Sequence, residues 1–219
     1  MIAHKLKTIF VHIPKTAGSS IEVALNAVEQ REDGAVDPMT GEFVNVITGA
    51  EKHMTAQACR EFVGDEAWDS YFKFSVVRNP FDRLHSMWWN LQHVGKRHAV
   101  GMRQFADIAF HRGVRGRLTN WRQRKWKVHQ RYWPQTHWLR SQNGEIEMDQ
   151  VLKFENIAED FAGLAQRIGL PSTELPKVLM KNRRPSSRRP YAEDYDDETR
   201  RIVTDFYRED LEAFGYEFE

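Results

Sequence analysis

A short segment near the start of the chain, PKTAGSS at residues 14–20, combines the residue types that bind anions. Lys15 places a positive charge at the edge of this segment, where it can neutralise a bound anion. Gly18 has no side chain, so the backbone there lets a phosphate or sulfate group approach closely. Hydroxyl groups that can donate hydrogen bonds come from three further residues, Thr16, Ser19 and Ser20. The segment therefore predicts a phosphate or sulfate site, with an ordinary turn closed by a capping serine as the alternative.

The elements expected around this segment favour the same interpretation. Residues 8–13, TIFVHI, form an apolar run that is typical of a central parallel strand, and Pro14 ends it. The following letters, SIEVALNAV, have helical spacing, with Ser19 or Ser20 as the N-cap. A helix N-terminus presents unpaired N–H groups, and its dipole favours an anion. Because the lysine precedes the glycine, the GxxxxGK(S/T) pattern fails, and magnesium-dependent ATP or GTP chemistry is not implied.

A second candidate binding segment is RNPFDRLHS, which follows a predicted strand at residues 71–77. Arg78 leaves the end of that strand, and Ser86 lies eight residues further on, inside the helix that follows. An arginine can bind a phosphate group through two parallel hydrogen bonds, and a serine hydroxyl can complete the site. The alternative is a structural turn, in which Asp82 and Arg83 fix the start of the helix.

Strands and helices alternate along the rest of the chain. A third strand is predicted at residues 149–154, and a final helix at 196–216 would place Ile202, Phe206, Leu211 and Phe214 on one face. Earlier helices are predicted over residues 55–64, 79–94 and 155–170. This alternation predicts an α/β fold with a central parallel sheet flanked by helices.

Positive charge is concentrated at residues 95–140, which contain twelve lysines or arginines and one acid, whereas residues 191–219 contain eleven acids and three arginines. Such a basic segment indicates a polyanionic partner or a multiply charged ligand. Mutual neutralisation of the two regions on the folded surface is the alternative. Four tryptophans can stack on sugar rings or pack in the core: Trp121, Trp126, Trp133 and Trp138.

The length of 219 residues suits one domain, and we predict a single domain with a basic helical insertion around residues 95–140. The only cysteine, Cys59, favours a reducing compartment and disfavours a zinc site built on cysteines. The sequence contains no run of about 18 apolar residues and no signal-peptide pattern. We therefore expect a cytoplasmic protein without a membrane span.

Taken together, IPKTAGSS and FSVVRNPFDRLHS resemble the two cofactor-binding motifs of the sulfotransferases. The resemblance is closest to the branch that includes carbohydrate sulfotransferases and their bacterial relatives. It extends over nearly the whole chain, through segments such as LKFENIAEDFAGLAQRIGL, and is weakest at residues 95–135. It implies a three-layer fold like that of nucleotide kinases, in which a P-loop-like segment follows the first strand of a parallel sheet.

The resemblance also implies the donor, 3′-phosphoadenosine 5′-phosphosulfate (PAPS), and the residues that hold it. The 5′-phosphosulfate would bind the loop formed by Lys15, Thr16, Ala17, Gly18, Ser19 and Ser20. Arg78 and Ser86 would bind the 3′-phosphate. The segment KNRRPSSRR departs from the family pattern by its extra arginines, and we add Arg184 and Arg188 as contacts of the 3′-phosphate. Lys15 would stabilise the charge on the leaving phosphate, and no carboxylate cluster requires a metal ion.

The acceptor hydroxyl needs a base, and His53 is the candidate. A histidine has an intrinsic pKa near neutrality, and His53 matches a histidine that the resembling carbohydrate enzymes keep between the two motifs. A surface histidine without a catalytic role is the alternative. His12, within the predicted strand, is expected to be a packed residue. Glu22 ranks lower, because an ionised glutamate is a weaker base and repels an anionic donor.

The predicted activity is therefore in-line transfer of a sulfuryl group from PAPS to an acceptor hydroxyl. The expected acceptor is a glycan or glycolipid, and the basic segment favours an acidic one. One alternative is a nucleotide or small-molecule kinase, which would need a lysine after the glycine and an acidic magnesium ligand. Another is a nucleic-acid-binding protein that uses residues 95–140, and the two motifs disfavour it.

Overall fold

The computed structural model describes residues 1–29, 53–94, 100–110, 129–176 and 190–219. The chain divides into two compact units, which are described separately. The first unit comprises Met1–Val77 and His137–Arg184, and the second comprises Arg78–Thr136 and Pro185–Glu219.

The first unit contains a four-stranded sheet with the order β1-β2-β3-β4. The strands are β1 (Ile2–Ala3), β2 (Thr8–Val11), β3 (Phe72–Val77) and β4 (Gln150–Lys153). Strands β2, β3 and β4 are parallel, as predicted, whereas β1 pairs with β2 in the antiparallel direction. The sheet is therefore mixed but largely parallel, and the predicted α/β class is confirmed. Strand β2 ends at Val11 rather than at residue 13, because His12 and Ile13 already belong to the loop.

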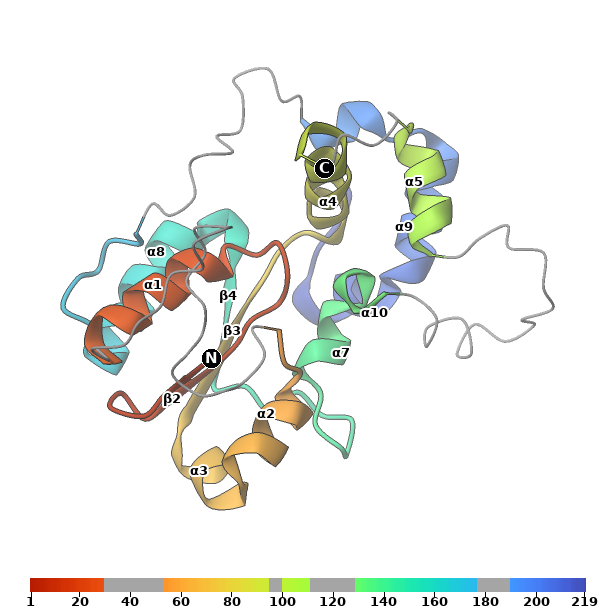
Figure 1. The fold of residues 1–219 in the computed structure, drawn as a ribbon. Helices are drawn as coiled ribbons and strands as arrows, with labels where there is room; N and C mark the ends of the chain where they lie inside the picture. Colours follow the sequence, from red (N-terminus) through yellow and green to blue (C-terminus); the bar gives the residue numbers. More distant parts are fainter. Residues whose placement is uncertain (30–52, 95–99, 111–128, 177–189) are drawn as a thin grey trace. The chain divides into compact units, whose positions relative to one another are not determined.

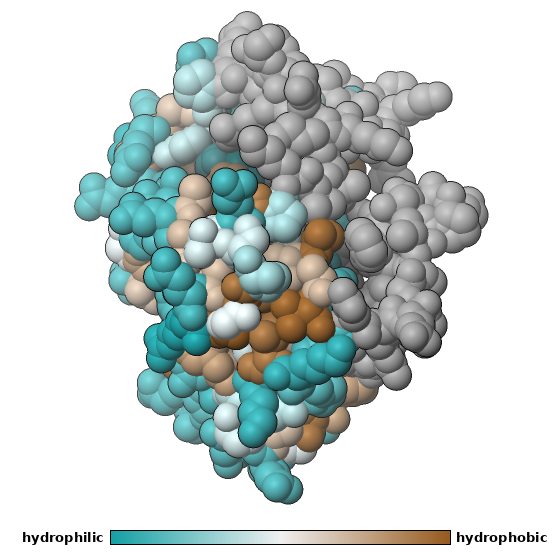
Figure 2. Space-filling view, turned by 90° about the vertical axis from the view of Figure 1, so that its left-hand side faces the viewer, coloured by the Kyte–Doolittle hydropathy of each residue, from teal (hydrophilic) through white to brown (hydrophobic). Residues whose placement is uncertain are grey.

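Two helices, α1 (Gly18–Glu29) and α8 (Ile157–Ile168), lie next to each other along one face of this sheet (Figure 1). Alternate strand residues point toward them, because successive side chains of a strand face opposite sides. The resulting core joins Phe10, Phe74, Val76 and Leu152 of the sheet to Ile21, Leu25, Phe161 and Leu164 of the helices. Viewed from that side, the described side chains are mainly hydrophilic around one hydrophobic area (Figure 2), as expected for amphipathic helices.

The opposite face of the sheet is also buried, through Ile9, Val11 and Val77. Helix α2 (Ala56–Val63) contacts β2, and α3 (Asp65–Ser70) follows it directly. Figure 1 shows both helices on the side of the strands opposite α1 and α8. The first unit thus has three layers, consistent with the P-loop-like architecture that the sequence predicts.

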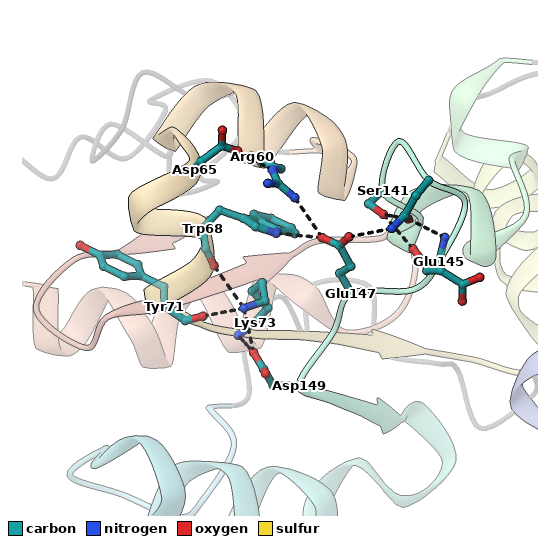
Figure 3. Close-up of polar contacts among 10 residues, drawn as sticks. Arg60, Asp65, Trp68, Tyr71, Lys73, Ser141, Glu145, Glu147 and Asp149 are labelled. Atoms are coloured by element: carbon teal, nitrogen blue, oxygen red, sulfur yellow. Dashed lines mark hydrogen bonds and ion pairs between the residues drawn. The ribbon is translucent and has the colours of Figure 1, made fainter.

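The carboxylate of Glu147 connects α2 and α3 to the segment that leads into β4 (Figure 3). It accepts a hydrogen bond from the Trp68 indole at 3.0 Å and lies 3.4 Å from the Arg60 guanidinium, which also binds Asp65 at 2.6 Å. The Ser141 hydroxyl, the Trp68 indole and the charge of Arg60 lower the pKa of Glu147. This ionised carboxylate therefore stabilises the junction between the consecutive helices α2 and α3 and a segment that is distant from them in the sequence.

The second unit is helical in the residues that the structure describes. Its helices are α4 (Pro80–Val94), α5 (Met102–Ala109), α9 (Asp197–Phe206) and α10 (Arg208–Phe214), and its 3₁₀ turns are η1 (Gln130–Tyr132) and η4 (Tyr191–Asp194). Its core gathers apolar side chains from these elements, among them Phe81, Leu84, Phe105, Ile202 and Tyr207. Across all described segments, none of the helices combines the length and apolar character needed to cross a membrane.

One predicted element of this unit is wrong. The single final helix expected over residues 196–216 is two helices, α9 and α10, separated at Tyr207. The Tyr207 side chain is fully buried, and its hydroxyl donates to the Tyr132 backbone oxygen at 2.8 Å. The chain turns at this position so that the ring can pack inward. Of the four residues expected to share a face, Ile202 is buried and the others are only partly buried.

The insertion predicted around residues 95–140 stays a prediction, because residues 95–99 and 111–128 lie outside the described part. What is described of it includes α5, η1 and the short helix α7 (Gln135–Leu139), which begins in the second unit and ends in the first.

Candidate active site

The loop between β2 and α1 has an unusual backbone. Lys15 and Ala17 adopt left-handed conformations, with φ angles of 73° and 69°. Such a conformation costs a residue with a side chain about 1–2 kcal/mol, and backbone strain of this kind clusters at functional sites. Thr16 lies between them, fully buried, and its hydroxyl donates to the Ile13 carbonyl at 2.8 Å. The Thr16 hydroxyl therefore shapes the loop, and only its backbone N–H is left to serve an anion.

Helix α1 starts at Gly18, so Ser19 and Ser20 belong to its first turn rather than preceding it. The N-cap position is Ala17, so the predicted Ser19 or Ser20 is wrong by two or three residues. The first intrahelical bond runs from Ser20 N–H to the Ala17 carbonyl at 3.0 Å. The first turn contains no acidic residue, so no carboxylate there offsets the positive end of the helix dipole. This end of α1 has the electrostatic character that the predicted anion site requires.

Gly18 is required by packing within the protein. A β-carbon at this position would lie 2.0 Å from two ring atoms of His12, Cδ2 and Nε2. Real β-carbons do not come so close to other heavy atoms, so even alanine would displace the ring. The sequence suggested that a glycine is needed here to give room to a phosphate group. The structure adds a second reason, which is that the His12 ring occupies the space of a β-carbon.

His12 and Glu22 form a buried pair beside the loop, with 2.8 Å between Nδ1 and Oε1. Their exposed fractions are 3% and 4%, and the His12 ring also stacks on Phe10. A carboxylate oxygen accepts, so the hydrogen of His12 lies on Nδ1. The prediction that His12 is packed is confirmed. The Glu22 carboxylate is engaged with His12, which disfavours its role as the base.

His53 lies next to His12, with ring centroids 4.5 Å apart, and its Nδ1 is 3.1 Å from the His12 backbone oxygen. A carbonyl oxygen can only accept, so Nδ1 of His53 carries the hydrogen. The neutral ring then has its basic lone pair on Nε2. The structure therefore places His53 beside His12, just before the loop that leads to α1, with Nε2 as the basic nitrogen of the neutral ring.

The second motif begins at Arg78, the residue that directly follows β3. Its Nε and Nη2 donate to Oδ2 of Asp82 at 2.9 and 2.6 Å, and only 5% of its side chain is exposed. Asn79 caps α4 by accepting from the Phe81 N–H at 3.1 Å, and Ser86 is buried within that helix. Arg78 and Ser86 belong to the second unit, whereas residues 15–20 and His53 belong to the first.

Arg83 has a structural role, as one alternative proposed. Its buried guanidinium donates to the backbone oxygens of Trp133 at 3.0 Å and Arg131 at 2.8 Å. Burial lowers the pKa of Arg83. This residue thus anchors α4 to the segment before α7.

Sequence reasoning missed two residues near the second motif: Gln135, which contacts Arg78 directly, and Asp210, which holds Gln135. The side-chain amide of Gln135 makes two hydrogen bonds to the backbone of Arg78, and the Asp210 carboxylate accepts from the backbone N–H of Gln135 at 2.7 Å. No local pattern marks either residue, because their partners are more than fifty positions away in the sequence.

Other predicted residues cannot be placed. Arg184 and Arg188 lie outside the described residues, as do Trp121 and Trp126. Trp138 is completely buried, with its ring 6.3 Å from that of His53, and Trp133 is partly buried. Trp138 therefore packs in the core, which is one of the two roles that the sequence allowed for these tryptophans.

The sequence model of the sulfotransferase family matches residues 1–217, which is nearly the whole chain. The protein belongs to this family, and it is accordingly a PAPS-dependent transferase. No significant match was found among curated proteins or among solved structures.

Proposed function

We propose that this sulfotransferase moves a sulfuryl group from PAPS to a hydroxyl group of a carbohydrate, in line, with His53 as the general base. The observation that carries the proposal is the hydrogen bond from Nδ1 of His53 to the His12 carbonyl, beside the loop that leads to α1. With the hydrogen on Nδ1, the basic lone pair of the neutral ring is on Nε2, and the ring lies beside His12, the residue that follows β2.

The donor would be held by residues of both motifs. The strained loop and the first turn of α1 fit a phosphosulfate group, because they combine a lysine, backbone N–H groups and a helix dipole, with no acidic residue in that first turn. Arg78 and Ser86 would bind the 3′-phosphate, together with Arg184 and Arg188. The positioning of Arg78 by Asp82 supports this assignment, since it fixes the direction of the guanidinium.

During transfer, Nε2 of His53 would take the proton of the acceptor hydroxyl while the hydroxyl oxygen forms a bond to sulfur. The bond between sulfur and the bridging oxygen of the 5′-phosphate would break, and Lys15 would neutralise the charge that appears on that phosphate. A single electrostatic group of this kind lowers a barrier by about 3–4 kcal/mol. The proposal assigns this stabilisation to Lys15 and backbone N–H groups, without a metal ion.

The acceptor proposal rests on the family resemblance and on a cavity of 470 Å³ between α2, α3 and residues 141–147. Amide and carboxylate groups suited to sugar hydroxyls line it: Gln57, Glu61, Asp65, Gln142, Asn143 and Glu147. Arg60 is the basic residue in this lining, which favours a neutral glycan here. The basic segment at residues 95–140 favours an acidic glycan instead, and a comparison of neutral and acidic oligosaccharides as acceptors separates the two.

The test of the proposed function is transfer of labelled sulfate from PAPS to a panel of glycans and glycolipids, with mass analysis of the product. His53→Ala should abolish transfer while binding of 3′-phosphoadenosine 5′-phosphate (PAP) survives. The control His4→Ala changes an exposed histidine of the same unit. Equal transfer by His53→Ala and the parent protein would remove His53 from the base role.

The family match favours this function over the kinase alternative. A nucleic-acid-binding role would depend on residues 95–140, of which half lie outside the described residues, and nothing in the described half supports it. A cytoplasmic location stays a prediction, and the buried free thiol of Cys59 is compatible with it.

A further inference from the structure

The backbone of Arg78 is held by a side chain rather than by a neighbouring strand. The Arg78 N–H donates to Oε1 of Gln135 at 2.9 Å, and Nε2 of Gln135 donates to the Arg78 carbonyl at 2.8 Å. Both bonds are buried, and Gln135 has no exposed surface. The pairing between β3 and β4 ends one residue earlier, at Val77 and Lys153. The amide of Gln135 therefore takes the place of a strand partner for the next residue.

Gln135 is itself fixed by a buried carboxylate. Oδ2 of Asp210 accepts from the Gln135 N–H at 2.7 Å, and Oδ1 accepts from the N–H and the hydroxyl of Thr136 at 2.9 and 3.0 Å. Asp210 is completely buried, and burial raises its pKa against these hydrogen bonds and the nearby charge of Arg83. A fully satisfied buried network of this kind fixes one arrangement of its members.

The side chain of Arg78 is held as well, because Asp82 accepts from two of its nitrogens. Arg78 is thus constrained at both ends, by Gln135 at the backbone and by Asp82 at the guanidinium. We propose that Gln135, held by Asp210, is a positioning residue that aims Arg78 at the 3′-phosphate of the donor. This inference rests on the proposed role of Arg78 as a ligand of that phosphate.

The chemistry of the position explains why a glutamine is needed. Its side-chain amide supplies one donor and one acceptor, which match the carbonyl and the N–H of Arg78. Methionine has a similar length and supplies neither. Ionised glutamate lacks the donor, whereas protonated glutamate has both. Loss of the amide would leave two buried backbone groups unpaired and would let the start of α4 shift.

The experiment compares two nucleotides that differ only in the 3′-phosphate, PAP and adenosine 5′-phosphate, by calorimetric titration of the full-length protein. The Kd of adenosine 5′-phosphate divided by the Kd of PAP is the ratio that measures recognition of the 3′-phosphate. Gln135→Met should lower this ratio about tenfold, the loss of one well-aligned contact, with adenosine 5′-phosphate binding unchanged. The control Gln166→Met replaces an exposed glutamine of α8 and should leave the ratio unchanged. A folded Gln135→Met protein with the parent ratio would overturn the inference.

A second variant applies even if Gln135→Met fails to fold. In Gln135→Glu, the ratio relative to the parent protein at the same pH should fall at pH 8 and recover toward pH 5. The introduced carboxyl group is buried beside Asp210, so it takes up a proton readily and then regains the missing donor. A relative ratio that stays at the parent value at both pH values would also overturn the inference.

Arg78→Ala separates this inference from the proposed function. If Arg78→Ala lowers the ratio and the Gln135 variants do not, the positioning role fails and the role of Arg78 stands. If Arg78→Ala itself keeps the parent ratio, Arg78 is not a ligand of the 3′-phosphate, and both proposals fail.

Discussion

Gly18 lies so close to the His12 ring that the two residues act as one packing unit. We expect Gly18→Ala to lower the free energy of unfolding by about 2 kcal/mol, since an added methyl group in a packed interior forces its neighbours to move. Sulfate transfer should fall further, because displacement of His12 also moves the carbonyl that orients His53. Thermal unfolding and initial rates measure the two effects.

The control for this prediction is Gly163→Ala on α8, where a β-carbon would meet no atom within 4 Å. Alanine is favoured over glycine inside a helix, so this variant should gain about 0.5–1 kcal/mol and keep its activity. Two alanine substitutions with equal effects would contradict the packing of Gly18 against His12.

Single residues also show how far the site could be predicted from sequence. Lys15 and His53 were proposed from residue type and from the family resemblance, and both stay predictions. The packing reason for Gly18 could not be found, because it depends on the direction of the His12 ring. Gln135 and Asp210 were missed for a related reason: each acts on a residue that only the fold brings near.

Among the elements, the junction of α2, α3 and the segment before β4 depends on the charge of Glu147. Because its pKa is lower in the folded protein than the ordinary value of 4.5, the unfolded chain takes up this proton first as the pH falls. Its stabilisation is therefore complete above about pH 5.5 and decreases as the pH falls through 4.5 toward the folded-state pKa.

Glu147→Gln should lower the free energy of unfolding by about 1 kcal/mol at pH 7, and the difference from the parent protein should shrink below pH 4.5. Denaturant titrations across this range test the change. Glu145→Gln, at an exposed position of the same segment, is the matched control. If the difference in free energy of unfolding between Glu147→Gln and the parent protein stays constant with pH, the ionised carboxylate of Glu147 does not stabilise this junction.

The break between α9 and α10 provides a second test at this scale. Tyr207→Phe removes the hydroxyl that donates to the Tyr132 carbonyl and leaves that buried oxygen unpaired. We expect a loss of about 1–2 kcal/mol of unfolding free energy. Tyr71→Phe, which removes a hydroxyl near exposed His4, should cost less. Equal losses would show that the hydroxyl of Tyr207 does not stabilise the break.

Local pattern was a good guide to most elements. The helix over residues 55–64 was predicted closely, because Thr55 and Gly64 mark its two ends. Strand β1 was missed, since two residues are too few to show alternation. The break at Tyr207 was missed because helical spacing of apolar residues continues through it, and the burial of the Tyr207 ring depends on the fold.

At the scale of the whole molecule, family membership predicts that PAP stabilises the folded protein. A ligand at one hundred times its Kd adds about 2.7 kcal/mol to the free energy of unfolding. PAP should therefore raise Tm in the parent protein and much less in Lys15→Ala at the same concentration. Lys5→Ala, at an exposed position, should respond like the parent protein. An unchanged shift in Lys15→Ala would contradict its place in the donor site.

His12 contacts two other residues of the candidate site in the first unit: its ring packs against Gly18, and its carbonyl accepts a hydrogen bond from His53. Substitutions at these positions should consequently be epistatic. A small residue at position 12 would make room for a side chain at position 18, yet it would leave the Glu22 carboxylate without its buried partner. Viable variants should therefore change positions 12, 18 and 22 together, and a selection that randomises all three at once should recover combinations that no series of single substitutions can reach.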